Sequence, residues 1–150
     1  MRPLLRLFVA MAALTGGAAE AQDARTPSGA VDAYHKALTL GDTAGALALL
    51  ARDLVVFEAG VIDATLEAYA FRHLPMDMDY AAKTQWQLES RRMGGAGELY
   101  WTLSAYRVTG SDKDGNPVDQ TTLETIFLRR IGESFRIVHL HRSSQPTPKP

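Results

Sequence analysis

The second half of the chain holds four consecutive runs of strand-forming residues joined by short links, and this pattern restricts the possible folds most. The runs are Lys83–Met93, Glu98–Val108, Val118–Arg130 and Ser134–Ser143. Their links carry glycine or polar turn residues, as around Gly115. Such links join antiparallel neighbours, because parallel strands need a crossover connection of a dozen or more residues. The pattern therefore predicts an antiparallel sheet from this half of the chain.

The residues before this sheet carry signals for helices. Thr26 followed by Pro27 is typical of a helix start, and apolar residues then recur at helical spacing as far as Gly41. Glycine is common just beyond the last helical residue, so we expect Gly41 to end this helix. Asp42 can cap a second helix, since its side chain can accept a hydrogen bond from the first turn.

A short strand and a third helix complete the first half. The segment Leu54–Phe57 is rich in β-branched and aromatic residues, which predicts a strand that Gly60 ends. Asp63 can cap the following helix, and we expect Pro75 to end it, because proline disfavours helical geometry in the residue before it. Helices followed by a curved antiparallel sheet make an α+β fold.

Alternation along the last strand predicts which side chains share a face. Side chains of a strand point to opposite sides in turn. Strict alternation gives one face to Phe135, Ile137, His139 and His141 and the other to residues such as Leu140. Apolar residues on both faces imply that both are covered. The helices supply one cover, and we expect a second subunit to supply the other, giving a homodimer packed through the sheet.

The first residues have the pattern of a secretory signal peptide. Arg2 and Arg6 give a positive start, Leu7–Leu14 is apolar, and Ala19-Glu20-Ala21 is a small-x-small cleavage site. We expect residues 1–21 to be removed, with cleavage after Ala21. The alternative, an uncleaved membrane anchor, is disfavoured because a span needs about 20 apolar residues. The protein is therefore expected to be secreted, into the periplasm if the source is bacterial, without stable membrane insertion after cleavage.

Composition excludes several functional classes. The 150 residues include no cysteine, which excludes disulfides, thiolate metal sites and cysteine nucleophiles. The 16 basic and 17 acidic side chains leave no basic excess for a nucleic acid backbone. We expect one domain over residues 22–144 and a flexible proline-rich tail over 145–150. Neither a phosphate-binding loop nor a dinucleotide fingerprint is present.

Two segments of the sheet region resemble a known superfamily. The first, Ser104–Thr125, contains a hairpin with the motif Asp-x-x-Gly-x-Pro and then Glu124-Thr125. The second, Phe135–Ser144, has an aromatic residue, one further residue and then Ile-Val-His-x-His-x-Ser. These features resemble the nuclear transport factor 2-like superfamily, most closely its SnoaL-like members. They are also similar to the association domain of calcium/calmodulin-dependent protein kinase II.

The resemblance implies a cone-shaped α+β barrel, usually dimeric, with a pocket between the curved sheet and the helices. The superfamily includes isomerases, cyclases, dehydratases, transport adaptors and binding domains, so the fold does not determine the function. The association domain lines its pocket with several arginines. Arg142 is the one arginine here that fits this pattern, whereas Ile126 follows the Glu-Thr pair.

Three of the four histidines are expected to converge in this pocket. His139 and His141 lie two residues apart on a strand and so point the same way. His73 lies on the apolar face of the third helix, which looks toward the concave side of the sheet in this fold. Glu58, at the end of the short strand, can join them. His35 is predicted to be a surface residue.

Three interpretations of this set stay open. Three imidazoles and a carboxylate suit zinc or copper, and the thioethers of Met76 and Met78 would favour Cu(I). Alternatively, His73 or Glu58 acts as a general base, with Tyr69, Tyr100 or Tyr106 polarising a carbonyl. In the third, the same side chains form a satisfied hydrogen-bond network that holds helix and sheet together.

The sequence therefore predicts an exported SnoaL-like protein that binds a small ligand in the pocket of the cone. The predicted lining is Glu58, Tyr69, His73, His139 and His141. One alternative function is periplasmic copper or zinc binding through the three histidines with a methionine. The other is a lyase or isomerase.

Overall fold

The computed structural model describes residues 24–147. The predicted signal peptide, residues 1–21, lies outside the described residues, as do residues 148–150 of the predicted tail. The first described helices are α2 (Pro27–Leu40) and α3 (Thr43–Ala48). Thr26 Oγ1 accepts a hydrogen bond from Gly29 N at 3.0 Å, and Gly41 adopts a left-handed φ of 67° at the C-terminus of α2. The predicted start and end of the first helix are confirmed.

The middle of the chain differs from the prediction. It forms β1 (Leu50–Glu58), β2 (Val61–Asp63), α4 (Leu66–Arg72) and α5 (Leu74–Lys83). Thr65, and not Asp63, caps α4, and Asp63 lies buried in β2. Pro75 lies in the first turn of α5, so it begins a further helix instead of ending the third one. A proline is tolerated there because the first N–H groups of a helix have no partner within the helix.

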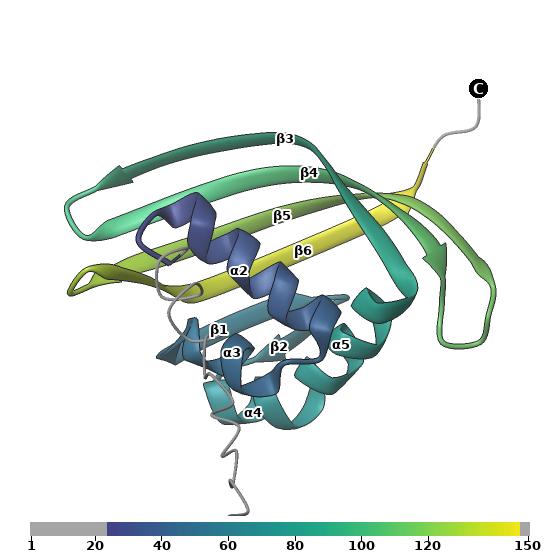
Figure 1. The fold of residues 1–150 in the computed structure, drawn as a ribbon, viewed down its shortest axis with the longest axis horizontal. Coiled ribbons are helices and arrows are strands. Elements are labelled where there is room, and N and C mark those ends of the chain that lie inside the picture. Colours follow the sequence, from purple (N-terminus) through teal and green to yellow (C-terminus); the bar gives the residue numbers. More distant parts are fainter. Residues whose placement is uncertain (1–23, 148–150) are drawn as a thin grey trace, which may run out of the picture.

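The four predicted strands are confirmed as β3 (Thr84–Ala96), β4 (Leu99–Ser111), β5 (Pro117–Ile131) and β6 (Ser134–Pro146). They are antiparallel neighbours in a six-stranded sheet of order β2-β1-β6-β5-β4-β3. β1 lies parallel to β6 and antiparallel to β2. β6 continues through Pro146, so the first two residues of the predicted tail belong to the sheet. Figure 1 shows the long strands curving over α2, with α4 and α5 below.

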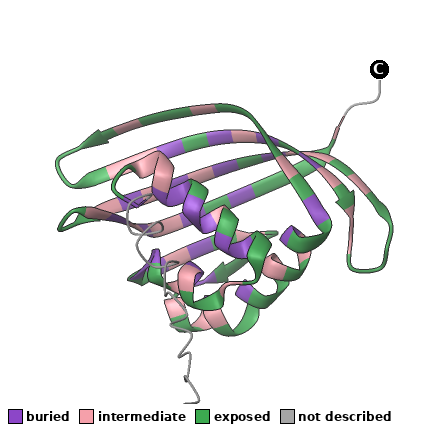
Figure 2. Ribbon diagram, viewed as in Figure 1, coloured by how far each residue is buried: buried purple, intermediate pink, exposed green. Residues whose placement is uncertain are grey.

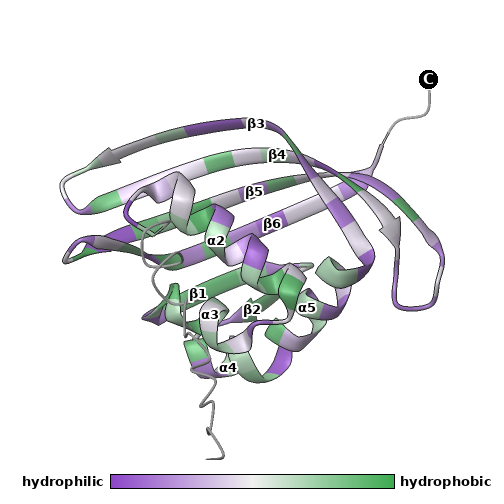
Figure 3. Ribbon diagram, in the orientation of Figure 1, coloured by the Kyte–Doolittle hydropathy of each residue, from purple (hydrophilic) through white to green (hydrophobic). Residues whose placement is uncertain are grey.

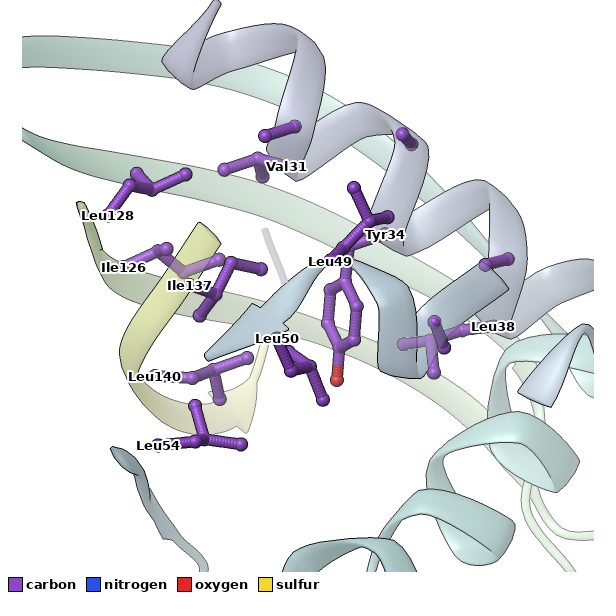
Figure 4. Packing of buried hydrophobic residues seen from close by; sticks show 14 of the residues in the cluster. Val31, Tyr34, Leu38, Leu49, Leu50, Leu54, Ile126, Leu128, Ile137 and Leu140 are labelled. Carbon is purple, nitrogen blue, oxygen red and sulfur yellow. The ribbon is translucent and has the colours of Figure 1, made fainter. Parts of the chain in front are cut away.

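The core lies between α2, β1 and the inner face of β5 and β6. Fully buried residues there include Val31, Leu54, Ile126, Leu128 and Ile137. Figure 4 shows these side chains meeting from the helix and from the strands, and Figure 2 shows the buried positions of α2 facing the sheet. None of the helices within residues 24–147 is long and apolar enough to cross a bilayer.

A β-bulge in β6 corrects the predicted faces of the last strand. Phe127 pairs with His139, but the next residue of β5, Leu128, pairs with Ile137, so Val138 is an extra residue. An extra residue reverses the alternation beyond it. Ile137 and Leu140 are therefore both buried in the core, and His139 and His141 lie on the opposite, outer face. The predicted face that joined the histidines to Phe135 and Ile137 is wrong.

Candidate functional site

A cavity of about 720 Å³ opens at one end of the cone. Its walls come from the C-terminal half of α2, from α5, from the start of β3 and from the ends of β1, β5 and β6. Figure 3 shows that this end of β5 and β6 is more hydrophilic than the stretch beside the core. The cavity is therefore placed where apolar packing stops and polar side chains begin.

Arg142 lies at the inner wall, where the reversed alternation of β6 turns it inward opposite Glu124 of β5. Its side chain is only 4% exposed. Its Nε donates a hydrogen bond to Glu124 at 2.9 Å, and its Nη1 lies 3.2 Å from Asp77 Oδ2 and 3.5 Å from Glu58 Oε1. The guanidinium also lies 5.4 Å from the ring centre of Trp86. One buried cation thus joins three carboxylates from three elements.

His35 completes this cluster from α2. Its Nε2 lies 3.1 Å from both carboxylate oxygens of Glu124. Burial by itself would raise the pKa of Glu124, but the charges and hydrogen bonds of His35 and Arg142 lower it to about 2. The surface position predicted for His35 is wrong, because its side chain is only 17% exposed and lines the cavity.

Glu58 stands at the end of β1 beside the turn into β2. Ala59 and Gly60 form this turn with positive φ values of 50° and 78°, as a two-residue hairpin requires. Burial raises the pKa of Glu58, and the charge of Asp77 adds to the rise, while Arg142 and His73 reduce it without cancelling it. The protonated form of Glu58 is therefore favoured relative to an exposed glutamate.

Two polar atoms of this wall have no hydrogen-bond partner among the described residues. They are Nη2 of Arg142 and Oε2 of Glu58, and both are buried. An unpaired buried donor or acceptor is costly, so native proteins pair most such groups. Because both side chains line the cavity, a ligand can supply the missing partners.

His73 also lines the cavity, and it is held from behind by Asp63. The fully buried carboxylate of Asp63 accepts hydrogen bonds from His73 Nδ1 and from Arg72 Nη2. Burial alone would raise the pKa of Asp63, but these two partners outweigh burial and lower it. Asp63 thus has a structural role that its predicted position as a helix cap did not suggest.

The structure brings together only part of the predicted site. Glu58, His73 and Met76 line the cavity. Tyr69 lies just behind it and donates to Asp77 at 2.6 Å, and Met78 packs against the core.

His139 and His141 do not reach the cavity. On the outer face, their ring centres lie 5.1 Å and 6.4 Å from that of Phe57. Across residues 24–147, no group of three histidine or acidic side chains is close enough to hold a metal ion. The predicted copper or zinc ligand set of His73, His139 and His141 is therefore not assembled.

Comparison with known proteins agrees with the fold. The model of the SnoaL-like domain family matches residues 28–148. No curated protein matches the sequence. Among solved structures, the chain is similar to a candidate ketosteroid isomerase from Shewanella frigidimarina, with 26% identity and a TM-score of 0.71 over 76% of this chain and 91% of that one.

Two further structures show the same fold at lower identity. A candidate dehydratase of the nuclear transport factor 2-like family from Streptomyces avermitilis has 15% identity and a TM-score of 0.70, over 84% of this chain and 99% of that one. A candidate calcium/calmodulin-dependent protein kinase II association domain from Xanthomonas campestris has 19% identity and a TM-score of 0.65, over 79% and 85%.

Proposed function

The chain belongs to the SnoaL-like domain family, and on that premise we propose that it binds a small, neutral organic ligand in the cavity at the end of the cone. The observation that carries the proposal is the pair of buried, unpaired atoms in the wall, Arg142 Nη2 and Glu58 Oε2. A volume of about 720 Å³ lies in the range of small-molecule sites.

The charges around Arg142 favour a neutral head group. Its guanidinium already has hydrogen bonds to Glu124 and Asp77, and Glu58 lies within ion-pair distance. The single positive charge is thus matched before any ligand arrives, and a carboxylate ligand would add a further negative charge to a buried acidic cluster. A carbonyl oxygen can accept from Arg142 Nη2 without that cost.

The rest of the cavity wall suits a ligand whose body is apolar. Trp86, Leu38 and Met76 contribute to the lining. The Trp86 indole lies beside the guanidinium of Arg142 and beside the His35 ring, with 5.2 Å between the centres of the two rings. A flat or aromatic group can pack against this indole. The ligand is therefore a molecule with a carbonyl-type head and an apolar or aromatic body.

A matched pair of probes tests this chemistry. Calorimetric titration with 4-phenylbutanamide and 4-phenylbutanoate compares a neutral and an anionic head on one body. We expect the amide to bind more tightly and its affinity to fall in Glu58→Ala, while Lys113→Gln, in the β4–β5 turn, serves as the control. Tighter binding of the carboxylate, or no binding of either probe, would contradict the proposal.

We also propose that the outer face of the sheet is covered by a second copy of the chain. Leu103, Thr125, His141 and Phe57 pair in one row across β4, β5, β6 and β1. Leu123, in the next row, is 56% exposed, and Leu103 is 44% exposed. Exposed apolar side chains grouped on one face of a sheet are typical of an interface, and the association domain similar to this chain has the same fold.

Light scattering after gel filtration tests the dimer. We expect twice the chain mass for the wild-type protein and a monomer for Leu123→Lys, because a charge on this face opposes its burial. Leu40→Lys, a matched change on α2 at a residue that is 68% exposed, is expected to leave the dimer intact. A monomeric wild-type protein would refute this assignment.

Export is the third part of the proposal, and it rests on the sequence of residues 1–21. Expression of the full chain in a Gram-negative host is expected to yield a periplasmic protein that begins at Gln22. Ala21→Arg removes the small residue at the cleavage position and is expected to retain the leader. Mass spectrometry of the wild-type protein distinguishes the two forms, and an intact cytoplasmic chain would contradict export.

A further inference from the structure

The first observation is the orientation of His73 by a buried carboxylate. His73 Nδ1 contacts Asp63, which is fully buried and also accepts from Arg72. In a neutral imidazole one ring nitrogen is a donor and the other an acceptor, and a carboxylate partner selects the donor. The proton therefore lies on Nδ1, and the lone pair of Nε2 is left for the cavity that the ring lines.

The second observation is that an acid stands near this base. Glu58 lines the same cavity, and the β1–β2 hairpin carries it together with Asp63, because Glu58 pairs with Val61 only two residues before Asp63. The charge of His73 lowers the pKa of Glu58, so the two side chains lie within electrostatic range of each other. Burial favours the protonated form of Glu58, so the cavity offers a proton acceptor and a proton donor together.

The third observation is an unpaired donor in the same cavity wall. Nη2 of Arg142 is buried, unpaired within the described residues, and next to Glu58 through the 3.5 Å contact of Nη1. A donor of this kind can hold a carbonyl oxygen and stabilise the negative charge that develops there when a neighbouring carbon loses a proton. Asp77 and Glu124 fix the guanidinium in place for this role.

We propose that His73, oriented by Asp63, and Glu58 form an acid–base couple that eliminates water from a neutral β-hydroxycarbonyl compound in the cavity. This inference rests on the proposed binding of a neutral carbonyl ligand. His73 and Glu58 are the catalytic residues, Arg142 holds the carbonyl oxygen, and Asp63 is a positioning residue.

The reaction balances without any further reactant. His73 Nε2 takes the proton from the carbon next to the carbonyl, and the electron pair of that C–H bond forms the new C=C bond. The C–O bond of the β-hydroxyl breaks, and the leaving oxygen takes its electron pair and the proton of the Glu58 carboxyl, so that water departs. The proton on His73 then returns to Glu58 through solvent, which restores both groups.

The experiment uses 4-hydroxy-4-phenylbutan-2-one in deuterated water with the mature protein. Proton NMR follows deuterium exchange at C3, the carbon that His73 would deprotonate, with the C1 methyl group as an internal reference for uncatalysed exchange. Absorbance of the conjugated enone follows the elimination. Saturation-transfer NMR on the same samples measures binding separately.

The variants separate the two proton transfers. His73→Gln is expected to lose both C3 exchange and enone formation by at least about 100-fold. Glu58→Gln is expected to keep C3 exchange and to lose enone formation, because only the leaving group then lacks its proton. Asp63→Asn is expected to slow exchange at unchanged affinity for the ketone, an effect that loss of packing alone would not produce. Lys113→Gln, in the exposed β4–β5 turn, is the control with wild-type rates.

Each outcome has one meaning. Binding of the ketone with C3 exchange no faster than in His73→Gln would overturn the elimination and leave ligand binding intact. Binding of 4-phenylbutanamide without binding of the hydroxyketone would overturn the substrate class alone. If neither compound binds, the proposed ligand binding fails together with the inference.

Discussion

The apolar and polar ends of the cone are built on the same two strands, and they differ in whether their buried side chains carry charge. On β5 and β6, Ile126 and Leu140 pair across the ladder and are buried in the core. Two residues further along each strand, at the next position that points inward, Glu124 pairs with Arg142, and both are also buried. The apolar end needs only close packing, whereas the polar end depends on partners for every charge.

The cavity lies where buried charged groups are incompletely paired. At the core end Ile126 and Leu140 carry no charge, although the hydroxyl of Thr102, opposite Ile126 on β4, is also buried without a partner among the described residues. The polar end satisfies Glu124 twice, through His35 and Arg142, yet leaves Arg142 Nη2 and Glu58 Oε2 unpaired within the described residues. Binding capacity therefore lies in the charged groups beside the cavity that folding leaves unsatisfied, and removal of different groups at the two ends should have different consequences.

The largest effect is expected when the polar end loses its cation. Arg142→Met leaves Glu124, Asp77 and Glu58 together without a positive guanidinium, and breaking a buried ion pair in this way costs about 4 kcal/mol. Urea denaturation should show this loss. The double variant Arg142→Met, Glu124→Leu should recover a large part of it, because no uncompensated charge is left at that ladder position. A single variant as stable as the wild type would show that the two ends do not differ as described.

The second-largest effect is expected from acid, which should reduce the stability that the polar end contributes. The pKa of Glu124 is about 2 in the folded protein, below its ordinary value of 4.5. The stability that Glu124 contributes is therefore complete above pH 4.5 and is lost as the pH falls through about 2. The difference between these values corresponds to about 3 kcal/mol. Denaturation curves recorded between these pH values should show the free energy of unfolding falling with the pH. Glu124→Gln should reduce the size of that fall.

A conservative change at the apolar end should cost less. Ile126→Val removes one buried methylene group, which costs about 1 kcal/mol. Because Ile126 lies on the core side of Glu124, the affinity for a cavity ligand should not change. Chemical denaturation and calorimetric titration on the same preparation measure both quantities, and a loss of affinity would indicate that the two ends are mechanically coupled.

The sequence predicted the apolar end better than the polar end. Periodicity and turn residues place α2 and the four long strands, because burial of apolar side chains enforces those patterns. The bulge at Val138 escaped prediction, since nothing in the local sequence distinguishes one extra residue from strict alternation. That one residue moves His139 and His141 to the outer face and turns Arg142 inward. A prediction built on alternation alone therefore chose the wrong histidines.

Glu124 and His35 could have been found by a different signal. Alternation along the predicted strand Val118–Arg130 places Ile126 and Leu128 on one face, and continuing it by two residues places the carboxylate of Glu124 on that face. An acidic residue in line with core positions needs a buried partner, and α2 is the element that covers this face. The partner on α2 is His35, one residue after the buried Tyr34. No comparable pattern indicates Asp63, because its contact with His73 depends on the unpredicted strand β2.

The smallest change in stability is expected at Glu58, and its direction distinguishes the two ends most sharply. Burial raises the pKa of Glu58 above its ordinary value of 4.5, so its ionised form is less favourable in the folded than in the unfolded chain. Glu58 therefore opposes folding as the pH rises above 4.5, the reverse of Glu124. Glu58→Gln removes that penalty and should leave stability unchanged or slightly higher, by less than about 1 kcal/mol at neutral pH. Thermal denaturation with a ligand titration tests this. A stable variant that has lost its ligand chemistry would show that Glu58 is kept for function at a cost in stability, whereas marked destabilisation would place Glu58 with Glu124 among the groups that hold the fold together.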